Sequence, residues 1–262
     1  MERIKEALER ARAERSGQLD AAPGITAKGH DQIRDVVYSQ TRNLDISQAK
    51  LRANRIVTEF PQGAFTDAYK MLRTQVLQRL RENNWNVLAV TSPGEGEGKT
   101  LTALNLAASM AMEVNHTVLL VDANLRHPSL HELLGLPGSP GLSDYLLNDT
   151  PVAELLVHPK GMEHLTILPA GRAMKNSSEM LNSAKMSRLV EEMKSRYASR
   201  IVIFDLPPVL NAADAMAFAP YVDAALLVVE EGKTKQAEVE NAMNLLSSTN
   251  VLGTVLNKSG RI

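Results

Sequence analysis

The sequence of 262 residues contains no cysteine. This absence excludes thiol catalysis, zinc sites built on cysteine and disulfide scaffolds. An excess of one charge is also lacking, because 29 lysine and arginine residues balance 30 aspartate and glutamate residues. The resulting net charge of −1 argues against a protein that binds nucleic acid through bulk positive charge. Hydrophobic residues make up 44% of the chain, which is enough for a buried core without metal or disulfide crosslinks.

Long apolar runs are missing as well. No segment approaches the ~20 apolar residues that a membrane-spanning helix needs. The chain begins MERIKEALERARAER, which is charged throughout and has no apolar core of the kind found in secretory signals. We therefore expect a cytoplasmic protein whose membrane role, if it has one, goes through a partner.

Two regions differ in their residue pattern. Residues 1–60 are polar and lack the pattern of buried strands, which predicts an extension of short helices and linker, with helices at 1–15 and 45–57 and a linker at 16–31. In residues 61–262, short apolar runs alternate with helical stretches, which indicates an α/β domain with a mostly parallel sheet covered on both faces. The expected strands span residues 86–91, 117–122, 165–169, 200–205, 224–229 and 251–257. The expected helices span residues 65–81, 100–112, 179–197 and 234–248.

A glycine-rich segment, SPGEGEGKT, follows the first of these strands and leads into a helix. Such a turn points several backbone N–H groups at one spot, where the helix dipole adds positive potential. Lys99 can then reach the outer phosphates of a nucleotide, and the Thr100 hydroxyl can bind Mg²⁺. Pro93 occupies the first glycine position of the usual phosphate-loop pattern, but the strand, loop and helix all fall where the chemistry needs them. The residues predicted to contact the nucleotide here are Gly94, Glu95, Gly96, Glu97, Gly98, Lys99, Thr100 and Leu101.

Two further strands of the domain end in aspartate, at Asp122 and Asp205. A single aspartate after a strand is commonly a turn or cap residue, but two downstream of a phosphate loop fit a nucleotide–Mg²⁺ site. Asp205 fits the role of holding Mg²⁺ through water. Asp122 fits either a Mg²⁺ ligand or a base that accepts a proton from an attacking hydroxyl. With Lys99, these aspartates are the predicted catalytic residues.

The phosphate loop, VLLVDANLR and IFDLPP resemble the Walker A, A′ and B motifs of bacterial tyrosine kinases, over about residues 51–258. The N-terminal segment is most similar to the subgroup encoded with exosortase-linked exopolysaccharide systems. The resemblance implies a P-loop NTPase fold and ATP- and Mg²⁺-dependent phosphorylation of protein tyrosines. It also implies a chain-length-determinant membrane protein as partner, which would recruit the chain to the inner face of the plasma membrane.

Three departures from related patterns keep alternatives open. Asn124 replaces the second aspartate of the A′ motif, and the chain ends without the family's tyrosine cluster, which leaves Tyr38 as the best accessible tyrosine. Both features allow a catalytically weak nucleotide-binding adaptor. Partitioning ATPases carry a signature lysine five residues before Lys99; Gly94 stands there, which disfavours but does not eliminate an ATPase switch.

Asp67, Lys70 and Arg73 lie at steps of three in the expected helix before the phosphate loop. Chemistry alone favours an intrahelical ion-pair face. Their position resembles that of the family's Glu-x-x-Arg-x-x-Arg helix, which implies a homo-oligomer contact. Asn257, at the end of the last expected strand, is expected to face the adenine.

Overall fold

The computed structural model describes residues 41–57, 63–113, 115–136, 138–196 and 199–260. The helix and linker expected at 1–15 and 16–31, and Tyr38, lie outside these residues. Contacts between residues divide the chain into Met1–Arg34 and Asp35–Ile262, and all of the described structure belongs to the second unit.

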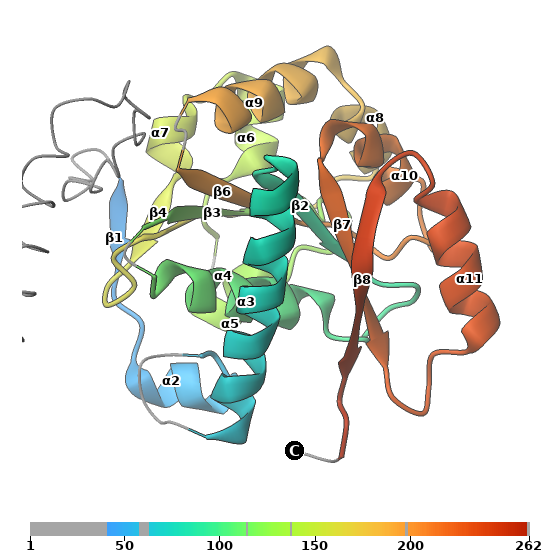
Figure 1. The fold of residues 1–262 in the computed structure, drawn as a ribbon. Helices are drawn as coiled ribbons and strands as arrows, with labels where there is room; N and C mark the ends of the chain where they lie inside the picture. The colour runs from blue at the N-terminus through green and yellow to red at the C-terminus, as the bar shows by residue number, and fades with distance from the viewer. Residues whose placement is uncertain (1–40, 58–62, 114, 137, 197–198, 261–262) are drawn as a thin grey trace, which may run out of the picture. The chain divides into compact units, whose positions relative to one another are not determined.

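One eight-stranded sheet runs through this unit in the order β1-β4-β5-β3-β6-β2-β7-β8 (Figure 1). Neighbouring strands pair in parallel except β4 and β5. The central strands β2, β3 and β6 are buried on both faces, as a parallel sheet between two helical layers requires. The strands are β1 (Arg42–Leu44), β2 (Val87–Thr91), β3 (Thr117–Asp122), β4 (Val157–Pro159), β5 (Leu165–Leu168), β6 (Arg200–Asp205), β7 (Ala224–Glu230) and β8 (Asn250–Asn257).

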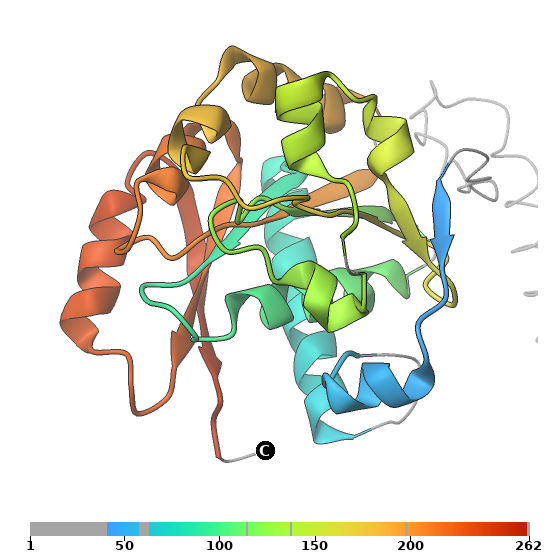
Figure 2. The ribbon, with the colours of Figure 1, turned by 180° about the vertical axis from the view of Figure 1, so that it is seen from behind.

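Alternate residues of these strands feed two hydrophobic clusters, one on each face. Helix α3 lies in front of the sheet in Figure 1 and behind it in Figure 2, on the face that it shares with α2, α4 and α5. On the other face Phe204 packs against Phe218, with ring centroids 4.8 Å apart. The helices of the first face are α2 (Gln48–Ala53), α3 (Ala64–Asn83), α4 (Lys99–Ala111) and α5 (Leu130–Leu134). Those of the second are α6 (Leu142–Asn148), α7 (Val152–Leu155), α8 (Ser177–Leu181), α9 (Ala184–Ser195), α10 (Asp214–Phe218) and α11 (Gln236–Leu245).

The predicted fold class and all six predicted strands are confirmed, with ends within one residue. The single helix predicted over 179–197 is wrong: it is α8 and α9. Ser183 separates them, because it adopts an extended conformation and its side chain accepts a hydrogen bond from the backbone N–H of Met186. The helix expected at 45–57 is limited to α2, where Leu51 is buried in the core.

The polar segment before residue 60 also contributes β1, which pairs with β4 and which the sequence did not predict. Residues 41–57 therefore share the sheet and the core with the residues that follow them. The expected boundary between extension and domain, at residue 60, stays a prediction.

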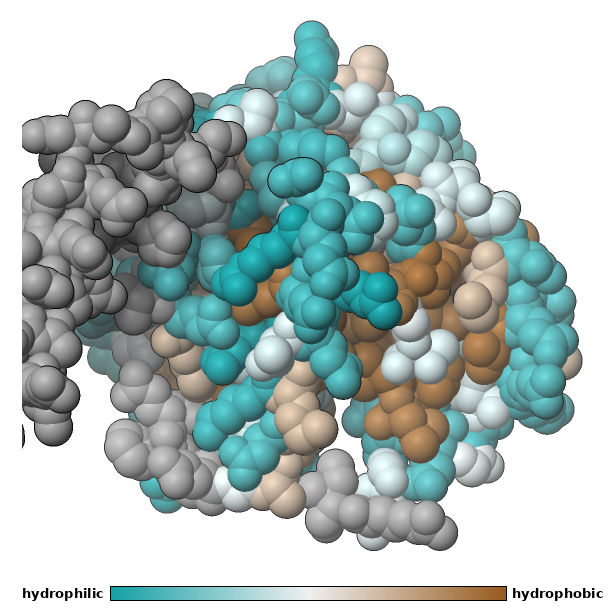
Figure 3. Space-filling view, viewed as in Figure 1, coloured by the Kyte–Doolittle hydropathy of each residue, from teal (hydrophilic) through white to brown (hydrophobic). Residues whose placement is uncertain are grey.

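Apolar side chains gather between α3 and α11, where β7 and β8 lie, while the outer surface of α3 is hydrophilic (Figure 3). Leu256 on the edge strand β8 is 57% exposed there. Within the described residues, every helix is either too short or too polar to cross a bilayer.

Candidate active site

The strand order places the predicted site residues at one edge of the sheet. β6 lies between β3 and β2, so the carboxyl ends of these three parallel strands are neighbours. Asp122 and Asp205 are directly paired in the register of β3 and β6. The phosphate loop follows β2 and leads into α4, which begins at Lys99. Residues far apart in the sequence therefore converge where parallel α/β sheets bind ligands.

The phosphate loop has the backbone shape of an anion-binding turn. Gly96 and Gly98 have φ angles of 75° and 91°, a left-handed region that favours glycine. Gly98 caps α4 without a side chain, so the first N–H groups of the helix have no capping side chain. These groups and the helix dipole favour an anion at this position, and phosphate binding there stays a prediction.

Glu97, within the phosphate loop, and three side chains from later in the chain hold the loop in place. Glu97 accepts a hydrogen bond from the N–H of Gly94 at 2.9 Å, and the Thr234 hydroxyl donates to the same carboxylate. The Asn257 amide donates to the Glu97 carbonyl at 2.8 Å, and the Lys258 ammonium donates to the Gly96 carbonyl at 2.7 Å. Asn257, predicted to face adenine, thus contacts the loop itself; its role toward adenine stays a prediction.

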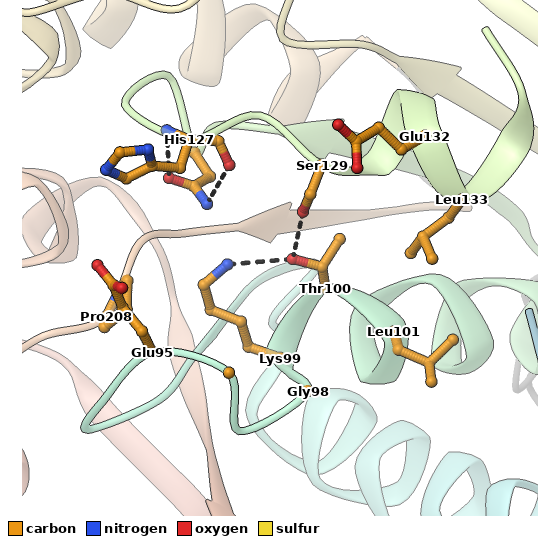
Figure 4. A pocket seen from close by; sticks show the side chains of 12 residues that line it. Glu95, Gly98, Lys99, Thr100, Leu101, His127, Ser129, Glu132, Leu133 and Pro208 are labelled. Carbon is orange, nitrogen blue, oxygen red and sulfur yellow. Dashed lines mark hydrogen bonds between the residues drawn. The ribbon is translucent and has the colours of Figure 1, made fainter.

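Lys99 and Thr100 lie at the mouth of the site (Figure 4). The Lys99 ammonium donates to the Thr100 hydroxyl at 3.0 Å and lies 3.6 Å from a carboxylate oxygen of Asp205. The Ser129 hydroxyl donates to the Thr100 hydroxyl at 3.3 Å, which brings the loop after β3 against the phosphate loop. Sequence reasoning missed Ser129; its position soon after the A′ motif was the available signal.

The two aspartates are fully buried. Burial, reinforced by the negative charge of Asp205, raises the pKa of Asp122 to about 8. Burial likewise raises the pKa of Asp205, and the Lys99 ammonium opposes that rise. Asp122 accepts hydrogen bonds from the N–H groups of Asn124 and Leu130, at 3.1 and 3.3 Å.

Neither carboxylate oxygen of Asp205 has a hydrogen-bond partner among the described residues. These buried oxygens make no hydrogen bond with the described part of the chain but lie near the Lys99 ammonium, the Asp122 carboxyl and the Thr100 hydroxyl. They are hard oxygen donors of the kind that Mg²⁺ prefers. The predicted metal set, Thr100, Asp122 and Asp205, therefore fits a magnesium ion.

A pocket of about 420 Å³ opens over Lys99 and Thr100. Of the residues predicted to contact the nucleotide, Glu95, Gly96, Gly98, Lys99, Thr100 and Leu101 line it, whereas Gly94, Glu97 and Asn257 do not. Their contact with a nucleotide stays a prediction. Residues that the sequence did not single out as site residues also line it, namely Asn124, His127, Ser129, Glu132, Leu133 and Pro208.

The three residues of the predicted oligomer helix do not share one outward face. Lys70 pairs with Asp67 at 3.1 Å on the surface. Arg73 instead points toward α4, where it donates to the Ser109 carbonyl at 2.9 Å and pairs with Glu113 at 3.1 Å. The homo-oligomer contact stays a prediction, with Arg73 already engaged inside the chain.

The described tyrosines all make internal contacts. Tyr69 is buried, and the Lys185 ammonium lies 4.9 Å from the centre of the Tyr145 ring. The Tyr221 hydroxyl donates to Asn182 at 3.0 Å.

Comparison with known proteins identifies the family. The AAA domain model matches residues 85–258. The tyrosine-protein kinase YwqD of Bacillus subtilis is 32% identical over 211 residues, which cover 80% of this chain and 87% of that protein. The succinoglycan biosynthesis transport protein ExoP of Rhizobium meliloti is 31% identical over 258 residues, which cover 95% of this chain but 30% of that protein.

Solved structures agree. The kinase domain of the Escherichia coli tyrosine kinase ETK matches with a TM-score of 0.69 and 28% identity, over 86% of this chain and 91% of that domain. Cobyrinic acid a,c-diamide synthase from Mycobacterium smegmatis, solved with an ATP analogue and magnesium, shares the fold with a TM-score of 0.56 and 22% identity, over 68% of this chain and 77% of that protein. The chain therefore belongs to the bacterial tyrosine kinases, protein-tyrosine kinases built on a P-loop nucleotide-binding domain.

Proposed function

We propose that this chain transfers the γ-phosphoryl group of ATP, with Mg²⁺, to a tyrosine hydroxyl of a protein in an exopolysaccharide export system. One observation carries the proposal: the buried, adjacent carboxylates of Asp122 and Asp205 lie beside Lys99 and Thr100 at the start of α4. This arrangement combines an anion-binding turn, a metal site and a base, which phosphoryl transfer requires together.

The backbone N–H groups of the phosphate loop bind the phosphates, and Lys99 neutralises charge on the β- and γ-phosphoryl groups. Thr100 and Asp205 hold Mg²⁺, which when bound supplies positive charge to the phosphate oxygens. Asp122 accepts the proton of the tyrosine hydroxyl as its oxygen bonds to the γ-phosphorus. The bond between the γ-phosphorus and the bridging oxygen breaks, and ADP leaves with that electron pair. A carboxyl with a raised pKa is a stronger base than an exposed aspartate once it is ionised.

The test is incubation of the purified chain with labelled ATP and Mg²⁺, followed by separation of phosphotyrosine from free phosphate. Label on tyrosine supports the kinase. Free phosphate alone would support an ATPase switch instead. Lys99→Met serves as the control that removes both products.

We further propose that the chain acts with a chain-length-determinant membrane protein, at the inner face of the plasma membrane. One relative, ExoP, is a succinoglycan biosynthesis transport protein, which supports a partner in an export system. Addition of the partner's cytoplasmic segment should raise tyrosine labelling. If that segment neither binds the chain nor raises its tyrosine labelling, this partner is rejected.

We propose that the chain also assembles with copies of itself through the exposed end of α3, which carries Asp67 and Lys70. A variant in which the charges of Asp67 and Lys70 are both reversed should have a lower molar mass in light scattering than wild type. An unchanged mass would place the contact elsewhere.

A further inference from the structure

We infer that Asn124 is a positioning residue whose side-chain amide closes the A′ loop, residues 123–129 between β3 and α5, and so orients Asp122 and Ser129. This inference rests on the proposed kinase function for the roles of those two residues. The asparagine at position 124 then performs a task that an aspartate cannot perform. It is more than an aspartate that has lost its charge.

The side-chain amide of Asn124 makes two hydrogen bonds to the backbone of His127, donating one and accepting the other. Its nitrogen donates to the His127 carbonyl at 2.8 Å, and its oxygen accepts from the His127 N–H at 3.3 Å. The orientation of the amide is fixed, because the other orientation would set donor against donor and acceptor against acceptor. Asn124 is 4% exposed, so water does not readily replace either bond.

An aspartate would satisfy only half of this arrangement. Its carboxylate accepts from the His127 N–H, but its second oxygen faces the His127 carbonyl, also an acceptor. It would also add a carboxylate beside the buried Asp122, whose pKa the neighbouring carboxylate of Asp205 already raises. The chemistry of the site therefore selects a neutral amide at position 124.

The closed loop holds the catalytic aspartate from both sides. One carboxylate oxygen of Asp122 accepts a hydrogen bond from the backbone N–H of Asn124, near the start of the A′ loop. The other accepts one from the backbone N–H of Leu130, directly after the loop. Closing the loop fixes the separation of these two donors and with it the orientation of the carboxylate. Figure 4 shows the outcome at the site: His127 turns away from the phosphate loop while Ser129 reaches Thr100.

The test compares wild type with Asn124→Asp, Asn124→Ala and the control Asn241→Asp, which makes the same charge change on the exposed surface of α11. Two measurements are made. Amide hydrogen exchange over residues 123–130 is recorded without nucleotide, and kcat and KM for ATP are recorded with saturating Mg²⁺ at pH 8.

For Asn124→Asp we expect faster exchange in the A′ loop and a drop in kcat of about tenfold at pH 8, with KM for ATP little changed because the phosphate loop is untouched.

Asn124→Ala should show the same faster exchange, and Asn241→Asp should match wild type in both measurements. The proposal is overturned if Asn124→Asp leaves loop exchange unchanged, or if its kcat equals or exceeds that of wild type at pH 8. Wild type without tyrosine phosphorylation would refute the proposed function, and loop exchange in the variants would then decide the positioning role alone.

Discussion

Replacement of Asp122 by asparagine should make the nucleotide-free protein more stable while it removes activity. The carboxyl is fully buried beside Asp205, and its pKa is raised from 3.8 to about 8. The folded state therefore favours the protonated form, whereas the unfolded chain ionises near pH 4. The contribution of Asp122 to the free energy of unfolding is therefore most favourable below pH 4, where the carboxyl is protonated in both states. It becomes less favourable as pH rises toward 8.

The magnitude follows from that shift. Between the unfolded pKa of 3.8 and pH 7, linkage at 1.36 kcal/mol per unit gives about 4 kcal/mol of lost stability. Asparagine avoids this loss, but its NH₂ group cannot accept one of the two backbone hydrogen bonds that Asp122 receives, which costs about 2 kcal/mol. The net gain at pH 7 is about 2 kcal/mol, which raises Tm by roughly 6 °C in a domain of this size.

Thermal and urea unfolding in EDTA at pH 4.5, 6, 7 and 8 would measure the effect. The free energy of unfolding of the variant minus that of wild type should change from negative to positive as pH rises. The variant should therefore be the more stable protein at pH 7 and 8. Asp223→Asn is the matched control. Asp223 accepts hydrogen bonds from the N–H groups of Asn86 and Val87, both at 3.0 Å, and pairs with Lys194, so its loss should destabilise. A variant at Asp122 that is no more stable than wild type at pH 8, or a difference independent of pH, would refute the reasoning.

Three other substitutions have defined outcomes. Lys99→Met should reduce phosphotransfer at least about a hundredfold with an unchanged circular dichroism spectrum, and near-normal activity would remove the phosphate-loop assignment. Asp205→Asn should weaken Mg²⁺ binding to the ADP complex about tenfold, and an unchanged Mg²⁺ titration would count against its role. Gly141→Ala should destabilise by about 3 kcal/mol in urea unfolding, because a Cβ there would lie 2.0 Å from the backbone oxygen of Pro169; normal stability would mean that this backbone yields.

The sequence predicts well what arises from local patterns. Strands such as β3 and β6 are recognisable because long apolar, β-branched runs need burial on both faces, whatever their neighbours. By contrast, β1 and β4 have three residues each, and they become strands only through pairing in space, β1 with β4 and β4 also with β5. No periodicity can be read from three residues.

Side-chain partners are harder to predict because they depend on distant residues. Asn257 meets Glu97, 160 positions earlier, once β8 brings it beside the phosphate loop. The steps of three from Asp67 to Arg73 suggested a common face, yet each step falls 60° short of a full turn. Two steps rotate Arg73 by about 120° relative to Asp67, which turns it toward α4. For Asn124, the residue type was visible but its bonds to the His127 backbone were not.

The fastened phosphate loop has a consequence for the order of events in turnover. Glu97, Asn257 and Lys258 hold the loop through contacts within the chain, so we expect nucleotide binding to require little loss of backbone entropy. The contacts that such a turn makes with α- and β-phosphates are common to ATP and ADP. A rigid loop therefore binds the product as tightly as the reactant, and we expect the departure of ADP to be the slow step of the cycle. Loosening the loop through Lys258→Ala is then expected to weaken affinity for both nucleotides and yet quicken product exchange.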